Sequence, residues 1–303
     1  MLPTFDNFFK DLSHWVRFFK MLSIMWLLAA VGCVEKISTQ GTAPSPLRTP
    51  VARSEESPRP APDTAIERRV LYYPNDEIYG EIPEGVEEIS LTTPDGLELN
   101  AWYLPPPETG PTLVYFHGNG GNLTGLGSQF EAFRSVGCGV LAIDYRGYGK
   151  SEGEPGEEGL YVDGLAAFDK AETLSPGRDL VVYGRSLGGG VASYVAKNRD
   201  CKGLVLESTF TSAGEVARYS HGDKGALLVN AFDNAAHLDG YAGPLLFIHG
   251  DRDETIPYFM SEQLHSALPG SELWRVEGAG HNDLRRVAGE EYSRRLGEFL
   301  GNL

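Results

Sequence analysis

Short runs of consecutive apolar residues recur through the second two thirds of the chain, and polar or mixed segments separate them. Each run is only a few residues long, which is typical of strands rather than helices. A strand that is apolar on both faces belongs to a parallel sheet covered by crossover helices. The pattern therefore predicts a mostly parallel sheet with helices on both faces, whose strands include residues 112–116, 140–143, 180–183, 204–206 and 245–249.

Two further β-rich runs precede this region, at residues 86–92 and 97–104. Pro94-Asp95-Gly96 stands between them, and this combination favours a tight turn. We therefore expect a β-hairpin at the start of the folded part.

The N-terminal 33 residues have a different character. A flank with basic residues precedes about a dozen mostly apolar residues that end at Cys33. This run is short for a spanning helix, which needs about 20 residues, and is typical of a secretory signal. Ala30-Val31-Gly32-Cys33 also resembles a bacterial lipobox, which implies cleavage before Cys33 and diacylation of its thiol. An uncleaved anchor that starts near Trp15 is the alternative.

Residues 34–66 are rich in Pro, Ser, Thr and Ala and cannot bury enough apolar surface to fold. We interpret them as a disordered tether between a signal or lipid anchor at residues 1–33 and a catalytic domain at residues 67–303. This organisation predicts a lipid-anchored protein of the bacterial cell envelope that faces the periplasm or the exterior.

Charge and cysteine content narrow the possible partners. The formal net charge is −16, which argues against nucleic acid as a partner because phosphates would be repelled. Three cysteines do not make a disulfide framework. Cys138 and Cys201 stand at predicted strand starts, where we expect buried small hydrophobic residues.

The run at residues 180–183 stops at Gly184-Arg185-Ser186-Leu187-Gly188, which reads as a nucleophile elbow. A sharp turn from strand to helix would hold Ser186 in a strained backbone conformation, so that Gly184 and Gly188 must lack a Cβ atom. The helix expected over residues 189–198 would point its N-terminal N–H groups at the serine, where negative charge develops during acyl transfer.

A serine nucleophile needs an imidazole base and a carboxylate that orients it. His281 is the best candidate base because it lies on a loop of small residues just after a strand-like segment. His249 lies inside an apolar strand, where packing is the simpler interpretation. The remaining candidates are a mid-helix histidine and two in a polar segment without a motif: His265, His221 and His237.

The carboxylate should follow a strand between Ser186 and His281, and the segment after residues 245–249 supplies Asp251 and Asp253. We favour Asp253, since Asp251 follows a glycine directly and can serve the turn itself. An oxyanion hole needs two backbone N–H groups. Leu187 should supply one, and the Gly-rich loop at residues 117–122 should supply the other.

Together these motifs resemble the α/β-hydrolase superfamily over residues 70–300, and within it the BEM46-like group of serine hydrolases. The resemblance implies an eight-stranded sheet, with Ser186 as nucleophile, His281 as base, Asp253 as acid, and the Asn119 and Leu187 amides as oxyanion hole. Only a short helical excursion fits at residues 212–232, so a lid domain should be minimal or missing. The motifs are His117-Gly118-Asn119, residues 144–151, Gly184-Arg185-Ser186-Leu187-Gly188, Phe232-Asp233-Asn234 and residues 278–283.

The first functional hypothesis is hydrolysis of a carboxylic ester or thioester through an acyl-enzyme. A serine peptidase or amidase is the second, because the same groups cleave amides. A non-catalytic, lipid-anchored binding protein on a hydrolase scaffold is the third. We expect a small-molecule or acylated ester substrate, a membrane partner through the lipid anchor, and no metal or organic cofactor. The oligomeric state stays open.

Overall fold

The computed structural model describes residues 64–227, 229 and 231–303. The predicted signal, the lipidation at Cys33 and the tether up to residue 63 lie outside the described residues. The first described element is helix α2 (Thr64–Leu71), so residues 64–66 are helical rather than part of the predicted disordered tether, and the described fold begins before the predicted start at residue 67.

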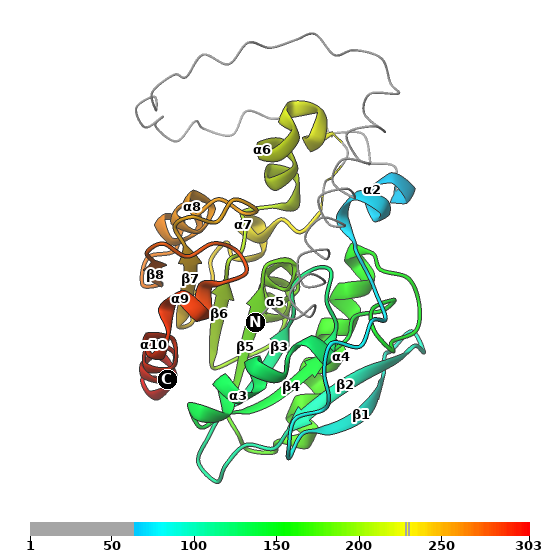
Figure 1. Ribbon diagram of the computed structural model, residues 1–303, viewed down its shortest axis with the longest axis vertical. Coiled ribbons are helices and arrows are strands. Elements are labelled where there is room, and N and C mark those ends of the chain that lie inside the picture. The colour runs from blue at the N-terminus through cyan, green and yellow to red at the C-terminus, as the bar shows by residue number, and fades with distance from the viewer. Residues whose placement is uncertain (1–63, 228, 230) are drawn as a thin grey trace, which may run out of the picture. The chain divides into compact units, whose positions relative to one another are not determined.

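The described chain forms one eight-stranded sheet with helices on both of its faces (Figure 1). The strands are β1 (Glu87–Thr92), β2 (Glu98–Leu104), β3 (Thr112–Phe116), β4 (Gly139–Ile143), β5 (Leu180–Arg185), β6 (Gly203–Glu207), β7 (Leu245–Gly250) and β8 (Glu272–Val276). The longer helices are α3 (Gly127–Ser135), α4 (Glu157–Leu174), α5 (Leu187–Asn198), α6 (Ala213–Ala226), α8 (Phe259–Ala267) and α10 (Glu290–Gly301), and the short ones are η2 (Leu123–Gly125), α7 (Asn234–His237) and α9 (Leu284–Ala288).

The strand order is β1-β2-β4-β3-β5-β6-β7-β8, and the strands from β3 to β8 run parallel. Strands β1 and β2 form the predicted hairpin, in which Leu91 lies opposite Leu99, and β2 joins β4 antiparallel. The predicted fold is thus confirmed. Because the parallel strands all end at one edge of the sheet, the loops that follow β3, β5, β7 and β8 share that edge.

The two faces of the sheet bury separate apolar layers, as the alternation of side chains along a strand requires. Val182 of β5 belongs to the layer under α4, α5 and α8, whereas its neighbours Val181 and Tyr183 belong to the layer under α3, α9 and α10. Helix α5 is therefore fixed against the sheet directly behind the predicted nucleophile.

The described residues between β6 and β7 form α6 and the short α7 rather than a separate lid domain, in agreement with the expectation. Helix α6 projects beyond α7 and α8 (Figure 1) and is kinked at Gly222, where φ is 67°. Within the described part of the chain, no helix combines the length and the apolar character needed to cross a membrane.

Candidate active site

The predicted triad residues come from three different loops at one edge of the sheet. Ser186 follows β5, Asp253 follows β7, and His281 follows β8. All three strands are parallel, so their carboxyl ends bring these loops together. The structure thus assembles in space residues that are separated by up to 95 positions in the sequence.

The turn at Ser186 has the strain that the elbow interpretation requires. Ser186 has φ 53° and ψ −118°, a backbone conformation that residues with a Cβ atom rarely adopt. A Cβ atom on Gly184 would lie 2.4 Å from the Gly188 carbonyl oxygen, and one on Gly188 would lie 2.1 Å from the Phe116 carbonyl oxygen. The prediction that both positions must be glycine is confirmed.

The three side chains form a continuous hydrogen-bonded chain. His281 Nε2 lies 3.1 Å from Ser186 Oγ, and His281 Nδ1 lies 2.7 Å from Asp253 Oδ2. A carboxylate can only accept, so Nδ1 carries the proton and Nε2 is free to accept the serine proton. Ser186 is 7% exposed and the Asp253 side chain is fully buried, so the polar chain is sheltered from bulk water.

The Asp253 carboxylate has a full set of partners. Its Oδ1 accepts the backbone N–H groups of Thr255 at 2.9 Å and Ile256 at 2.8 Å. Burial alone would raise the pKa of Asp253, but hydrogen bonds from His249 and His281 hold it well below its ordinary value. Asp253 is therefore ionised at neutral pH and able to stabilise an imidazolium at His281.

His249 has a contact with Asp253 that was not predicted from the sequence. It is buried in β7 as expected, but its Nε2 lies 3.3 Å from Asp253 Oδ2 and 2.8 Å from the Ile256 carbonyl oxygen. A carbonyl oxygen can only accept, so Nε2 carries a proton, while Nδ1 lies 2.7 Å from the Ser261 hydroxyl oxygen. A signal was present in the sequence, because His249 stands four residues before the predicted acid.

Asp251, the other candidate for the acid, has a structural role. Asp251 Oδ2 accepts from Arg275, and Asp251 Oδ1 accepts the Gly278 N–H at 2.7 Å. It ties the loop after β7 to the loop that carries His281, and it does not contact the imidazole. The geometry thus agrees with the choice of Asp253 over Asp251.

The loop after β3 packs against the elbow, as an oxyanion loop must. A Cβ atom on Gly118 would lie 3.4 Å from Ser186 Cβ. The Asn119 side chain accepts from Tyr148 and from the Tyr73 N–H, which anchors the loop. The Asn119 side-chain NH₂ group donates to the Leu71 carbonyl oxygen, whereas the backbone N–H groups of Asn119 and Leu187 donate to no other group among residues 64–227, 229 and 231–303. Both are thus available to a ligand.

The remaining histidines and the cysteines lie apart from this constellation. His265 in α8 bonds Ser271, His221 is exposed in α6, and His237 ends α7. Cys138 is buried as expected, and burial raises the pKa of its thiol to about 12. Cys201 is only half-buried, against the Tyr241 hydroxyl, rather than fully buried.

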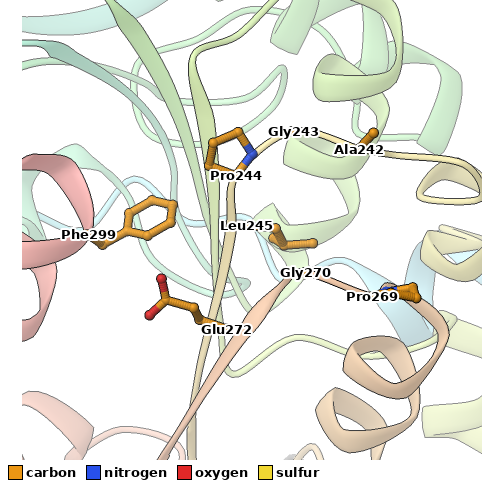
Figure 2. A pocket seen from close by; sticks show the side chains of 8 residues that line it. All are labelled: Ala242, Gly243, Pro244, Leu245, Pro269, Gly270, Glu272 and Phe299. Atoms are coloured by element: carbon orange, nitrogen blue, oxygen red, sulfur yellow. The ribbon is translucent and has the colours of Figure 1, made fainter. Parts of the chain in front are cut away.

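A hollow at the far edge of the sheet does not belong to this site. It lies where β7 and β8 begin, and Figure 2 shows the Glu272 carboxylate and the Phe299 ring at its wall. Ser186, Asp253 and His281 lie at the opposite edge, beyond the carboxyl ends of β5, β7 and β8. Among the residues that the structure describes, no cluster of His, Cys, Asp and Glu could hold a metal ion. The hollow is lined by Ala242, Gly243, Pro244, Leu245, Pro269, Gly270, Glu272 and Phe299.

Comparison with known proteins gives concordant matches. Residues 107–229 match the Hydrolase_4 family model, described as serine aminopeptidase, S33. The chain is 34% identical to the uncharacterized Escherichia coli K12 protein YfhR over 76% of this chain and 86% of that protein. It is 32% identical to the Arabidopsis thaliana α/β-hydrolase domain-containing protein WAV2 over 71% of this chain and 78% of that protein.

A solved structure extends the match to the fold. The Pyrococcus furiosus esterase Pf2001 superposes with a TM-score of 0.65 and 21% sequence identity, over 76% of this chain and 97% of that one.

Proposed function

Because the chain belongs to the Hydrolase_4 family of α/β-hydrolases, we propose that it is a serine hydrolase that cleaves a carboxylic ester or thioester through an acyl-enzyme. The observation that supports this most directly is the hydrogen-bonded chain from Ser186 through His281 to Asp253. The finer placement in the BEM46-like group is part of the proposal and is based on the motifs quoted above.

In the proposed acylation step, Ser186 Oγ attacks the substrate carbonyl carbon while its proton moves to His281 Nε2. The imidazolium so formed is stabilised by the Asp253 carboxylate. The oxygen of the tetrahedral intermediate accepts from the free amides of Asn119 and Leu187. The intermediate then collapses, the bond to the leaving group breaks, and the leaving group takes the proton from His281.

Deacylation repeats these steps with water. His281 Nε2 takes a proton from a water molecule as its oxygen attacks the ester carbonyl of acyl-Ser186. Collapse of the second tetrahedral intermediate releases the acid and returns the proton to Ser186 Oγ. The chain's own side chains and amides supply every group that these steps require.

A peptidase or amidase activity is the second candidate, and the description of the matching family model as a serine aminopeptidase favours it. Amide cleavage needs the same attack and a proton for the leaving amine, which His281 would deliver. An inactive scaffold is the third candidate, but it has less support because each part of the proposed machinery is in place.

The test is a substrate panel for the full chain in detergent. It contains p-nitrophenyl esters from acetyl to palmitoyl, an acyl thioester and an aminoacyl p-nitroanilide, and Ser186→Ala serves as the blank. We expect Ser186-dependent turnover of esters that peaks at one acyl length. Turnover of the anilide alone would replace the proposal by the peptidase, and no turnover with no labelling by a fluorophosphonate would support the scaffold.

We also propose that the chain is held at the bacterial cell envelope by acylation of Cys33, on the basis of the lipobox-like Ala30-Val31-Gly32-Cys33. Mass spectrometry of the protein from a bacterial host should find a diacylated N-terminal Cys33, and Cys33→Ala should release it from membranes. A mature protein that retains Met1 with an unmodified Cys33 thiol would contradict this.

A further inference from the structure

The side chain directly before the predicted nucleophile reaches the loop of the predicted base. Arg185 Nη2 donates to the His281 carbonyl oxygen at 2.8 Å and to Asn282 Oδ1 at 2.9 Å. Arg185 thus links the loop after β5 to the loop after β8, independently of the hydrogen bond between Ser186 and His281. The sequence gave no role to Arg185 beyond its place in the motif Gly184-Arg185-Ser186-Leu187-Gly188.

Arg185 is itself fixed by a buried acid. Its Nε donates to Glu207 Oε1 at 3.2 Å, and the Arg185 and Glu207 side chains are 24% and 6% exposed. The other oxygen of Glu207 accepts from the Tyr183 hydroxyl at 2.5 Å and from the Tyr292 hydroxyl at 2.8 Å. A planar guanidinium with one edge bound this way presents its other donors in a defined direction.

Glu207 also holds the elbow through its main chain, because its carbonyl oxygen accepts the Ser186 N–H at 2.9 Å. One residue at the end of β6 therefore positions the nucleophile through its backbone and the base through Arg185. Burial opposes the charge on Arg185, but the Glu207 carboxylate raises its pKa above the ordinary value, so the cation persists.

The base loop needs this support. Its first half is tied down, since Gly278 N–H bonds Asp251 and the Ala279 carbonyl oxygen accepts the Arg252 N–H. After Gly280, the described hydrogen bonds to the His281 carbonyl and to the Asn282 side chain come from Arg185. Without them, the second half of the loop would keep the hydrogen bond from the Gly280 N–H to Asp283 Oδ1 at 2.7 Å, which lies within the loop itself, and the two hydrogen bonds of the imidazole.

We propose that Arg185 is a positioning residue that, anchored by Glu207, holds the His281 loop at hydrogen-bonding distance from Ser186. This inference depends on the proposed hydrolase function. A displacement of about 1 Å in a catalytic group can cost about 100-fold in rate. We therefore expect loss of Arg185 to lower kcat by about 100-fold with little change in KM.

The single variant Arg185→Met leaves the Glu207 carboxylate buried without its cation, which destabilises the fold. The informative comparison is Glu207→Gln against Arg185→Met/Glu207→Gln. The double variant leaves no buried charge unpaired, whereas in Glu207→Gln the Arg185 cation loses its carboxylate and keeps the His281 carbonyl oxygen and Asn282 Oδ1 as acceptors. The matched control is Arg199→Met, which removes an arginine paired with Asp169 at the far end of α5.

We expect Glu207→Gln to keep kcat within about 10-fold of wild type, since Arg185 can still bond the loop. The double variant should lose about 100-fold in kcat with KM within about 3-fold, and a melting temperature close to that of Glu207→Gln. Arg185→Lys should restore part of the loss, because its ammonium keeps a charged donor for the loop but lacks the planar fork that bonds Glu207 and the two loop acceptors at the same time. Arg199→Met should match wild type.

The inference is overturned if the double variant keeps the kcat of Glu207→Gln, or if the loss is entirely in KM, which would make Arg185 a substrate contact. Wild-type protein is measured beside Ser186→Ala in the same assay. Wild-type turnover that depends on Ser186 but not on Arg185 rejects only the positioning role. Turnover or labelling that does not depend on Ser186 rejects both the role and the proposed function.

Discussion

Replacement of Ser186 by alanine is expected to lower kcat for ester hydrolysis by about 10⁶-fold, the loss found when a triad nucleophile is removed. Ser186 Oγ lies 3.1 Å from His281 Nε2, and the strained elbow holds Ser186 there with φ 53°. Alanine lacks the oxygen that forms the acyl bond, so only binding and the oxyanion amides would remain to act on an attacking water.

The measurement pairs steady-state rates with the mass of protein treated with a fluorophosphonate. Wild type should gain one adduct that proteolysis maps to Ser186, and Ser186→Ala should gain none. Ser193→Ala is the matched control, because its hydroxyl bonds the Gly189 carbonyl oxygen inside the same helix, away from the imidazole. An adduct on another residue, or a loss below about 100-fold, would contradict the assignment of the nucleophile.

Most of the fold could be predicted from local sequence patterns. Runs of apolar residues located the buried strands because a strand covered on both faces has no polar side, and Pro94-Asp95-Gly96 located the hairpin turn. The elbow could also be predicted from its local glycine-serine-glycine pattern, and a Cβ atom on Gly184 would indeed meet the Gly188 carbonyl oxygen four residues further on. The steric reason for Gly188 is not local, because a Cβ atom there would meet the Phe116 carbonyl oxygen of β3.

Contacts between distant loops could not be predicted in the same way. Even the contact between His249 and Asp253, which are only four residues apart, depends on how the chain turns after β7. Arg185 meets Glu207 because the two residues lie opposite each other in the pairing of β5 with β6. Arg185 meets His281 because β5 and β8 belong to the same sheet and the loop after β8 returns toward β5. Which side chains meet across a sheet edge is decided by register and loop shape.

The choice of Asp253 over Asp251 shows the same distinction. Asp251 and Asp253 are two residues apart after the same strand, and either could face His281 on spacing alone. The structure separates them because Asp253 accepts two backbone N–H groups of its own loop, whereas Asp251 turns to Arg275 and Gly278. The roles differ through main-chain geometry that the residue types do not encode.

Substitution of Asp253 by asparagine should lower kcat by about 10⁴-fold at neutral pH, because it inverts the tautomer of His281. The amides of Thr255 and Ile256 require an acceptor at the Oδ1 position, so the new amide must keep its oxygen there. Its NH₂ group then occupies the Oδ2 position, 2.7 Å from His281 Nδ1, and donates to it. The imidazole proton moves to Nε2, which faces Ser186. A protonated Nε2 cannot accept the serine proton.

The same NH₂ group would also face the Nε2–H of His249, which lies 3.3 Å from Oδ2, so two donors would meet in a buried place. The carboxylate therefore contributes to stability as well as to rate. Because the folded state lowers the pKa of Asp253, this contribution is complete above its ordinary pKa of about 4 and is lost as the pH falls below that value. Asp253→Asn should accordingly melt below wild type at pH 7, and the gap should narrow below about pH 4.

Rates on the preferred p-nitrophenyl ester and melting curves between pH 3 and 8 would test both parts on one set of proteins. Asp251→Asn is the matched control, because it changes the same chemical group two residues away without touching the imidazole; we expect it to cost less than about 10-fold in kcat. A loss in Asp251→Asn as large as that in Asp253→Asn would reassign the acid. A melting gap that stays constant down to pH 3 would mean that the Asp253 carboxylate is not held ionised by His249 and His281, since only a lowered pKa makes the gap depend on pH in this direction.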